Sequence, residues 1–336
     1  MSPAREPRTS GWAEVKAAVY HAYGLADALE LVEVDDPRPS EGEVLIGVRA
    51  ASVNSWDWDL LRGTPIVNRV GAFRRPKHEI LGADVAGVVE AVGGRVRDFA
   101  VRDEVYGDVS GCHWGGFAEY VCARPDALAR KPACLDFAQA AALPQAGMLA
   151  LQALRDVGRM QPGQSILING AGGGVGTLGV QLARALGASH VTGVDRGPKL
   201  EAVRALGADE VIDFTEADYA GGGPRFDLIV DPAGFRPIHQ VLPALRTRGT
   251  YVLVGGAGTV MIQGLALSPW YRWRQHKRVA LLRYRPKGDD LRAMAPLLEC
   301  GELVPHIDRV FPLADMADAL SWFSEGNAVG KIVIAM

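Results

Sequence analysis

The sequence has few cysteines, and the four that it contains do not cluster. Cys112, Cys122, Cys134 and Cys300 lie far apart among 336 residues. Structural zinc sites and dense disulfide frameworks need cysteines at short, repeated spacings, so the sequence predicts neither. No segment resembles a secretory signal peptide. These absences favour reduced thiols and a cytoplasmic location.

Long apolar runs and a strong charge of one sign are also missing. The longest stretch rich in alanine and leucine, Phe137–Leu154, is interrupted by Pro144 and by three glutamines, which argues against a membrane span. A formal net charge of −3 gives no overall attraction to nucleic acid or to an anionic membrane. With 48% hydrophobic and 22% charged residues, the composition is typical of a globular enzyme with two domains.

A glycine-rich stretch between an apolar run and a helical pattern is the most informative motif. Ser165–Asn169 reads as a strand, a glycine cluster follows, and Leu178, Leu182 and Leu186 then recur every four residues. The N–H groups at a helix N-terminus lack partners, and glycines let phosphate groups approach them closely. This order is therefore typical of a site for the pyrophosphate of a dinucleotide.

The register that fits best is Ala171-x-Gly173-x-x-Gly176, with alanine in the first position. A lone match of this kind is weak, because a glycine-rich helix cap looks the same. The candidate pyrophosphate-binding residues are Ala171, Gly172, Gly173, Gly174, Val175 and Gly176.

The residues that follow support a dinucleotide site. A second predicted strand ends at Asp195, nineteen residues after Gly176, where an acid would meet the adenosine ribose. Further strands are predicted over residues 210–214, 226–231 and 250–255, in alternation with helical patterns. This alternation predicts an α/β Rossmann domain with a doubly wound parallel sheet.

The signals for nucleotide preference are mixed. Asp195 should accept hydrogen bonds from the ribose of NAD and repel a 2′-phosphate, whereas the cations of Arg196 and Lys199 favour NADP. Val254 and Gly255, at the end of a predicted strand, complete the candidate cofactor contacts. We expect an NAD(P)H cofactor, with NADH slightly favoured over NADPH.

The segment Trp270–Lys287 contains seven arginine or lysine residues, several aromatic residues and no acid. Such a segment can bind nucleic acid or a membrane surface. The near-neutral charge of the whole chain instead favours a basic connector that packs on the fold's own surface or on a partner subunit. We therefore expect a small-molecule substrate, and neither nucleic acid nor a membrane as partner.

The regions on either side of the nucleotide pattern differ in character. From Val15 to Asp136, short β-type runs separated by glycine and proline predict a compact, mostly β domain. Helices are predicted over residues 289–301 and 315–326, and a closing strand over residues 331–335. Residues 1–14 are predicted to be a flexible N-terminal extension.

Six ordered motifs complete the pattern: Val15–Tyr20, Ala51–Trp58, Leu81–Gly93, Asp103–Gly107, Gly116–Val121 and Gly330–Ile334. Together they resemble the medium-chain dehydrogenase/reductase superfamily, in its zinc-independent, quinone oxidoreductase-like branch. The resemblance implies a discontinuous GroES-like catalytic domain of residues 15–136 and 287–336, and a Rossmann nucleotide-binding domain of residues 137–286. It also implies an active site between the two domains and a homodimer.

The residues that would hold a catalytic zinc are missing. Zinc-dependent relatives use a cysteine, a Gly-His-Glu motif and a second cysteine or aspartate. Here the first position falls in Ala51–Asn54 without a cysteine, and the second reads Gly82-Ala-Asp84. His78-Glu79 lies four residues too early. We expect no metal.

Reduction of an activated C=C bond does not need a metal. The conjugated carbonyl disperses the charge onto its oxygen, so a modest hydrogen-bond donor suffices. The resemblance places nicotinamide and substrate at Asn54–Trp58. The Asn54 amide can donate a hydrogen bond to the nicotinamide carboxamide, to a ribose hydroxyl or to the substrate oxygen, so Asn54 is a candidate for both cofactor binding and catalysis. Trp56 and Trp58 are candidates for stacking, although at least one of them is as well explained as core. Asp57 is read as a loop-capping residue. Tyr106 is a further candidate donor, although a buried tyrosine at a strand end is the commoner case.

We predict an NAD(P)H-dependent oxidoreductase that reduces the conjugated C=C bond of an enone or quinone-like substrate by direct hydride transfer. If the protein is an enzyme of another kind, the alternative is a zinc-free carbonyl reductase or a dedicated biosynthetic enoyl reductase. If it is not an enzyme, the alternative is a nucleotide-binding redox sensor without catalytic activity.

Overall fold

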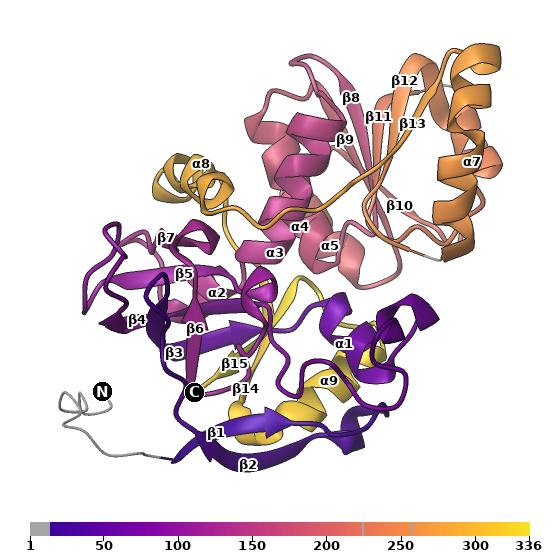
Figure 1. Ribbon diagram of the computed structural model, residues 1–336. Coiled ribbons are helices and arrows are strands. Elements are labelled where there is room, and N and C mark those ends of the chain that lie inside the picture. The colour runs from indigo at the N-terminus through magenta and orange to yellow at the C-terminus, as the bar shows by residue number, and fades with distance from the viewer. Residues whose placement is uncertain (1–13, 224, 257) are drawn as a thin grey trace.

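Two sheets organise the chain, and they use different stretches of it (Figure 1). The computed structural model describes residues 14–223, 225–256 and 258–336, so all of the predicted N-terminal extension except Glu14 lies outside the described residues. One sheet has six strands in the order β10-β9-β8-β11-β12-β13. The other has seven, with the path β14-β15-β3-β4-β5-β7 and β6 paired to β3.

The six-stranded sheet is parallel throughout, as predicted for a Rossmann domain. Its strands are β8 (Ser165–Asn169), β9 (His190–Asp195), β10 (Glu210–Asp213), β11 (Phe226–Asp231), β12 (Leu245–Leu253) and β13 (Arg278–Leu281). The helices α4 (Gly174–Ala185) and α5 (Lys199–Ala205) cover one face, and α7 (Gly258–Gln275) covers the other (Figure 1). Helices on both faces confirm the doubly wound architecture.

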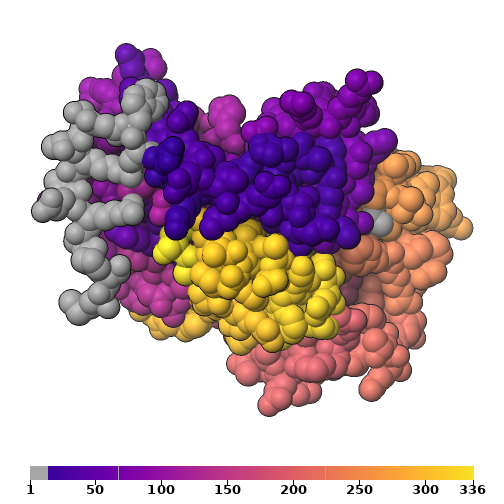
Figure 2. Space-filling view, turned by 90° about the horizontal axis from the view of Figure 1, so that it is seen from below, coloured from indigo at the N-terminus to yellow at the C-terminus, as the bar shows by residue number. Residues whose placement is uncertain are grey.

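The seven-stranded sheet combines residues from both ends of the described chain. Its strands are β3 (Val44–Ser52), β4 (Asp84–Val92), β5 (Glu104–Asp108), β6 (Tyr120–Ala123), β7 (Leu128–Arg130), β14 (Ile307–Pro312) and β15 (Lys331–Ala335). Strand β15 pairs with β3 and with β14, so a C-terminal strand lies inside a mostly N-terminal sheet. Figure 2 shows the same arrangement on the surface, where the C-terminal segment in yellow packs against the N-terminal segment in indigo. The discontinuous, mostly β part is therefore present, while its boundaries at 136 and 287 stay predictions.

The remaining elements connect or cover the sheets. They are β1 (Glu14–Val19), β2 (Glu30–Asp35), α1 (Ser55–Arg62), α2 (Phe137–Ala141), α3 (Pro144–Leu151), α6 (Ile238–Val241), α8 (Gly288–Glu299) and α9 (Met316–Ser324). One hydrophobic cluster runs from Ala86 of the seven-stranded sheet through Met148 of α3 to Val230 of the six-stranded sheet. Because this core is continuous, α3 fixes the position of one sheet relative to the other. No helix among the described residues combines the length and the apolar character that a bilayer span needs.

The structure differs from the sequence prediction around the basic segment. Trp270–Lys287 is not a simple connector, because it ends α7 and then forms β13. Strand β12 begins at Leu245, five residues before the predicted start at 250, and its register against β11 shifts after this first pair, so the regular pairing starts only at Thr250. Strand β13 has four residues and starts on a cation, so neither its length nor its pattern marks it in the sequence.

Candidate active site and nucleotide-binding loop

The glycine loop has the form that the fingerprint predicts. Gly170 adopts a φ of +80°, and Gly173 precedes α4, which begins at Gly174. A β-carbon on Gly176 would lie 2.1 Å from the Gly170 oxygen and 2.5 Å from the Ala171 α-carbon, so only glycine fits there. Gly170 supplies the tight turn one residue before the motif starts. This explains why alanine is accepted at the first position of the motif.

Asp195 lies at the carboxyl end of β9, beside the glycine loop. Its carboxylate accepts hydrogen bonds from the N–H groups of Gly172 (2.8 Å) and Arg196 (2.9 Å). The Lys199 side chain packs on Gly172, and burial lowers the pKa of its ammonium group while the nearby Asp195 charge opposes this. The structure therefore brings Gly172, Asp195 and Lys199 together at the carboxyl edge of the sheet, which is the edge where dinucleotides bind in folds of this kind.

The other candidate cofactor residues lie around the same edge. The Arg196 guanidinium donates to the Gly326 carbonyl and to Asn327 Oδ1, both at 3.3 Å. Val175 packs against the core, and Val254 and Gly255 directly follow β12, with the Val254 N–H bonded to the Asp231 carbonyl at 3.0 Å.

A pocket of about 450 Å³ adjoins this edge. It is lined by the last residue of β8 and by residues that follow β10 and β11, among them Phe214, Ala233 and Phe235. The side chains of Phe214 and Phe235 are 50% and 75% exposed. Two exposed aromatic rings at the rim of a pocket of this size can enclose a flat heterocycle.

Asn54 lies at the start of α1, and its amide is fixed by charges on both sides. Nδ2 donates to Asp84 Oδ2 at 2.9 Å, while Oδ1 accepts from the ammonium group of Lys331. Lys331 also donates to the Val53 carbonyl (2.9 Å) and to Asp84 Oδ2 (3.2 Å). Asp84 and Lys331 are 0% and 4% exposed, so the ion pair is buried. The orientation of the Asn54 amide therefore follows from its two charged neighbours.

The same lysine connects Asn54 to the glycine loop. A β-carbon on Gly174 would lie 2.7 Å from Lys331 Cδ, so the lysine stem passes close to the start of α4. The preceding N–H, of Gly330, donates to the Gly172 carbonyl at 2.8 Å. The predicted nicotinamide residue and the predicted pyrophosphate loop thus lie on either side of β15.

Asp57 supports the backbone around Asn54, as the sequence indicates. Its carboxylate accepts from the N–H groups of Asn54 (2.8 Å) and Gly82 (2.9 Å). The side chain is fully buried, and this burial raises the pKa of the Asp57 carboxyl to about 7, against the lowering effect of the two hydrogen bonds.

The three aromatic candidates have different surroundings. Trp56 is 40% exposed and its ring meets Trp114 edge-on, with centroids 5.2 Å apart. Trp58 is partly buried against an apolar cluster, and the Arg62 guanidinium lies over its ring. Tyr106 is buried, and its hydroxyl donates to the Leu291 carbonyl at 3.3 Å. Of the three, Trp56 is the most exposed.

A second buried carboxylate was not singled out by the sequence. Asp108 accepts hydrogen bonds from the Tyr284 hydroxyl, from the Ser110 N–H (2.8 Å) and from the Gln145 amide (3.4 Å). Burial, with a smaller contribution from Asp84, raises the pKa of the Asp108 carboxyl to about 6. The Gln145 N–H also donates to Asp84 at 2.8 Å, so the two acids belong to one network.

Within the described residues, no group of three or more histidine, cysteine, aspartate or glutamate side chains is placed to hold a metal ion. All four cysteines are described and free. His78 lies against Trp114, with ring centroids 6.2 Å apart. The expectation of a zinc-free site stays a prediction.

Comparisons with known proteins agree with this architecture. Residues 40–133 match the alcohol dehydrogenase GroES-like domain, and residues 206–334 match a family described as zinc-binding dehydrogenase. A 2-methylene-furan-3-one reductase of Solanum lycopersicum is 35% identical over 334 residues, which cover 96% of this chain and 79% of that protein. An NADPH-dependent alkenal/one oxidoreductase of Arabidopsis thaliana is 34% identical, with the same shares.

Among solved structures, the quinone oxidoreductase from Coxiella burnetii matches with a TM-score of 0.86 and 30% identity, over 96% of this chain and all of that one. Identity at this level over almost the full length, together with the shared domain architecture, establishes descent from one ancestor. The chain belongs to the medium-chain dehydrogenase/reductase superfamily, in its quinone oxidoreductase-like branch.

Proposed function

We propose that this protein uses NAD(P)H to reduce the conjugated C=C bond of an enone or quinone-like substrate, without zinc. The observation that carries the proposal is the Asn54 amide, fixed by Asp84 and Lys331 beside the glycine loop. The relatives named above support it, because two of their names state an enone-type or alkenal substrate and a third states a quinone.

The bound nicotinamide supplies the hydride, and the chain's own residues orient the substrate and stabilise charge. Asn54 Nδ2 carries two N–H bonds, of which the contact with Asp84 uses one, so the second remains for a carbonyl oxygen. Lys331 donates to Asn54 Oδ1 and so polarises the amide, which makes the free N–H of Nδ2 a better donor to the oxygen where negative charge develops as an enolate forms. The exposed face of Trp56 stacks on the planar substrate.

For the cofactor, we propose that the adenine ring occupies the pocket between Phe214 and Phe235, and that Asp195 binds the ribose. NADH is then slightly favoured over NADPH, because a 2′-phosphate would face the Asp195 carboxylate. Lys199 beside it leaves room for use of both nucleotides. The name of the Arabidopsis relative states NADPH dependence for that protein.

We further propose a cytoplasmic homodimer formed through the nucleotide-binding parts. Ile262, Leu265 and Trp273 of α7 are 67%, 70% and 76% exposed, and β13 is an edge strand of its sheet. Apolar side chains next to an open strand edge are typical of a subunit contact. Sedimentation of the purified protein tests this, and elemental analysis of the same sample tests the absence of zinc.

The deciding experiment uses cofactor deuterated at C4 of the nicotinamide. With an enone as substrate, deuterium should appear at the β-carbon of the saturated ketone that forms. Label at the carbonyl carbon, with an allylic alcohol as product, would instead establish the zinc-free carbonyl reductase alternative. Complete absence of turnover across enone, quinone and ketone panels would favour the redox-sensor alternative.

Asn54→Ala is the matched variant. It removes the proposed donor, but the Asp84–Lys331 pair remains. We expect kcat to fall by a factor on the order of 10–100, because the proton that completes the reaction comes from water and no single residue is indispensable. An unchanged kcat in a variant that still binds cofactor would contradict the role of Asn54.

A further inference from the structure

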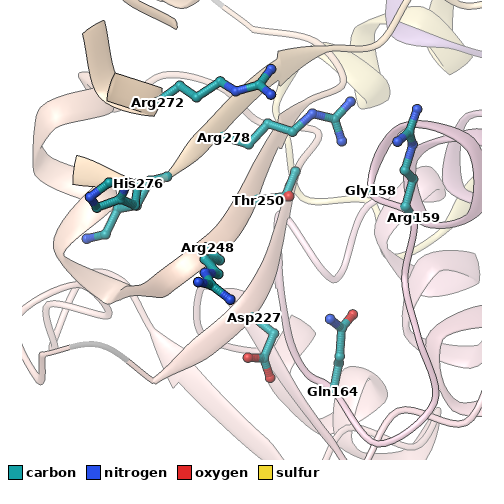
Figure 3. Close-up of a pocket in the computed structure, with 10 residues that line it drawn as sticks. Gly158, Arg159, Gln164, Asp227, Arg248, Thr250, Arg272, His276 and Arg278 are labelled. Carbon is teal, nitrogen blue, oxygen red and sulfur yellow. The ribbon is translucent and has the colours of Figure 1, made fainter. Parts of the chain in front are cut away.

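A recess of about 640 Å³ lies at the edge of the six-stranded sheet opposite the glycine loop (Figure 3). The strands β11, β12 and β13 are parallel, so their amino ends meet at this edge, while the nucleotide residues meet at the other. Five of the ten residues that line the recess are cations, namely Arg159, Arg248, Arg272, Lys277 and Arg278, and His276 lies beside them. Asp227 is the acid in its lining.

The positive charges in this recess are not balanced by acids. The Asp227 carboxylate already accepts from the Arg246 guanidinium (2.7 Å) and from the Ser165 N–H (2.9 Å). Over the described stretches of the chain, Arg159, Arg248 and Arg272 form no ion pair. Their positive charge therefore faces the recess without a protein counter-ion.

The other two cations of the recess, Lys277 and Arg278, hydrogen-bond to backbone carbonyl groups and so have structural roles. The Arg278 guanidinium donates to the Val157 carbonyl, and Lys277 donates to the Leu242 carbonyl, each at 2.6 Å. Burial lowers the pKa of Arg278, and the nearby positive charges of Arg159 and Arg272 lower it further. In Figure 3, the side chains of Arg272 and Arg278 extend toward the side on which Arg159 stands.

The backbone around the recess is strained. Arg159, Arg248 and His276 have φ values of 53°, 67° and 53°, and they are three of the six non-glycine residues with positive φ in the described chain. The Arg248 N–H donates to the His276 carbonyl at 2.8 Å, which holds two of these residues together. Such conformations cost on the order of 1–3 kcal/mol each and cluster at binding sites.

We propose that this recess binds a small polyanion with two or more phosphate groups, at a site separate from the nucleotide loop. Its volume lies in the range of small-molecule sites, and its cations surround a hollow. Guanidinium groups hold phosphate oxygens in a bidentate manner, so a polyphosphate would supply the counter-charge that the protein lacks. Arg272, Lys277 and Arg278 belong to the basic segment Trp270–Lys287, so the proposal gives this segment a role in ligand binding.

The test is a calorimetric titration of the full-length protein with inorganic tripolyphosphate, in the presence of saturating NADPH or NADH. The cofactor fills the site for pyrophosphate groups at the glycine loop, so binding must occur elsewhere. We expect one tripolyphosphate per chain, with affinity reduced at least tenfold in Arg159→Gln/Arg272→Gln. Arg274→Gln is the matched control, because Arg274 lies on the same helix, is exposed and does not line the recess. It should bind as the unmodified protein does.

Four results would overturn the proposal. The first is no binding at low ionic strength, and the second is binding that disappears when the cofactor is added. The third is an equal loss of affinity in Arg274→Gln, which would reveal only general attraction to a basic surface. The fourth is tighter binding of an RNA oligonucleotide or of anionic vesicles that depends on Arg159 and Arg272, which would assign the recess to a macromolecular partner.

Discussion

Two groups of charged side chains in this protein have opposite surroundings. Lys331 is buried, and its ammonium group is bonded to Asp84 and to Asn54. Arg159 and Arg272 are exposed around a recess, and water solvates them in place of an acid. A charge in a low-dielectric interior needs partners, whereas an exposed charge does not. The first group is therefore part of the folded architecture, and the second is available to a ligand.

Lys331→Met should have the largest effect on stability, because it removes the cation from a buried ion pair. It leaves the Asp84 carboxylate buried without a cation, and we expect the free energy of unfolding to fall by about 3–5 kcal/mol at neutral pH. Denaturant titration measures this. Lys16→Met, at an exposed lysine, should change stability by less than about 0.5 kcal/mol. Equal effects of the two substitutions would show that the buried pair has no special role.

Asp57 is the intermediate case, a carboxylate that is buried and held by N–H groups without a direct cation partner. Its pKa in the folded protein is about 7, above the ordinary 3.8, so the stability that it contributes is complete below about pH 4. That stability is lost as the pH rises toward 7, and the loss amounts to about 4 kcal/mol. Asp57→Asn should remove this pH dependence, measured as the difference in unfolding free energy between the two proteins from pH 4.5 to 7.5. A difference that stays constant with pH would show that the Asp57 carboxyl does not cause this pH dependence.

Asp195→Ser tests a carboxylate whose partners are backbone N–H groups. We expect nucleotide selectivity to move toward NADPH by roughly one to two orders of magnitude, about 1.4–3 kcal/mol, because the repulsion of a 2′-phosphate disappears. The ratio of kcat/KM for NADH and NADPH measures this change. Asp27→Ser, at an exposed acid outside the nucleotide-binding part, should leave the ratio unchanged. A ratio that is also unchanged in Asp195→Ser would show that this acid does not contact the ribose.

The smallest effect is expected in the recess. Arg272→Gln relieves repulsion of Arg278 and should raise the free energy of unfolding by a few tenths of a kcal/mol at low salt. Arg274→Gln should leave it unchanged. The difference between the two variants should vanish at high salt, where exposed charges are screened. A marked destabilisation by Arg272→Gln would mean that Arg272 has a structural role.

The sequence predicts features that depend on local pattern. The glycine loop, the position of Asp195 and the strand at residues 331–335 follow from periodicity and from glycine chemistry, and the structure confirms them. Trp56 and Trp58 are two positions apart on one helix, so they face different directions, but the sequence alone does not say which faces the core. The partners Asp84 and Lys331 are 247 residues apart, and no local pattern links them. The recess was missed for the same reason, because it takes residues from several separate elements.

The position of β15 has a consequence for how the protein is made. Lys331 bonds to the Val53 carbonyl across 278 residues, and β15 lies between β14 and β3 in the finished sheet. During synthesis, residues 50–52 of β3, which pair with β15, must therefore remain unpaired on that side until the whole nucleotide-binding part has left the ribosome, although β6 can already pair with residues 44–47. Contacts of such long range form slowly and leave strand edges exposed meanwhile. The glycine loop, which bonds to Gly330, receives this contact in the same late step, so cofactor binding competence should appear only after nearly all of the chain is made.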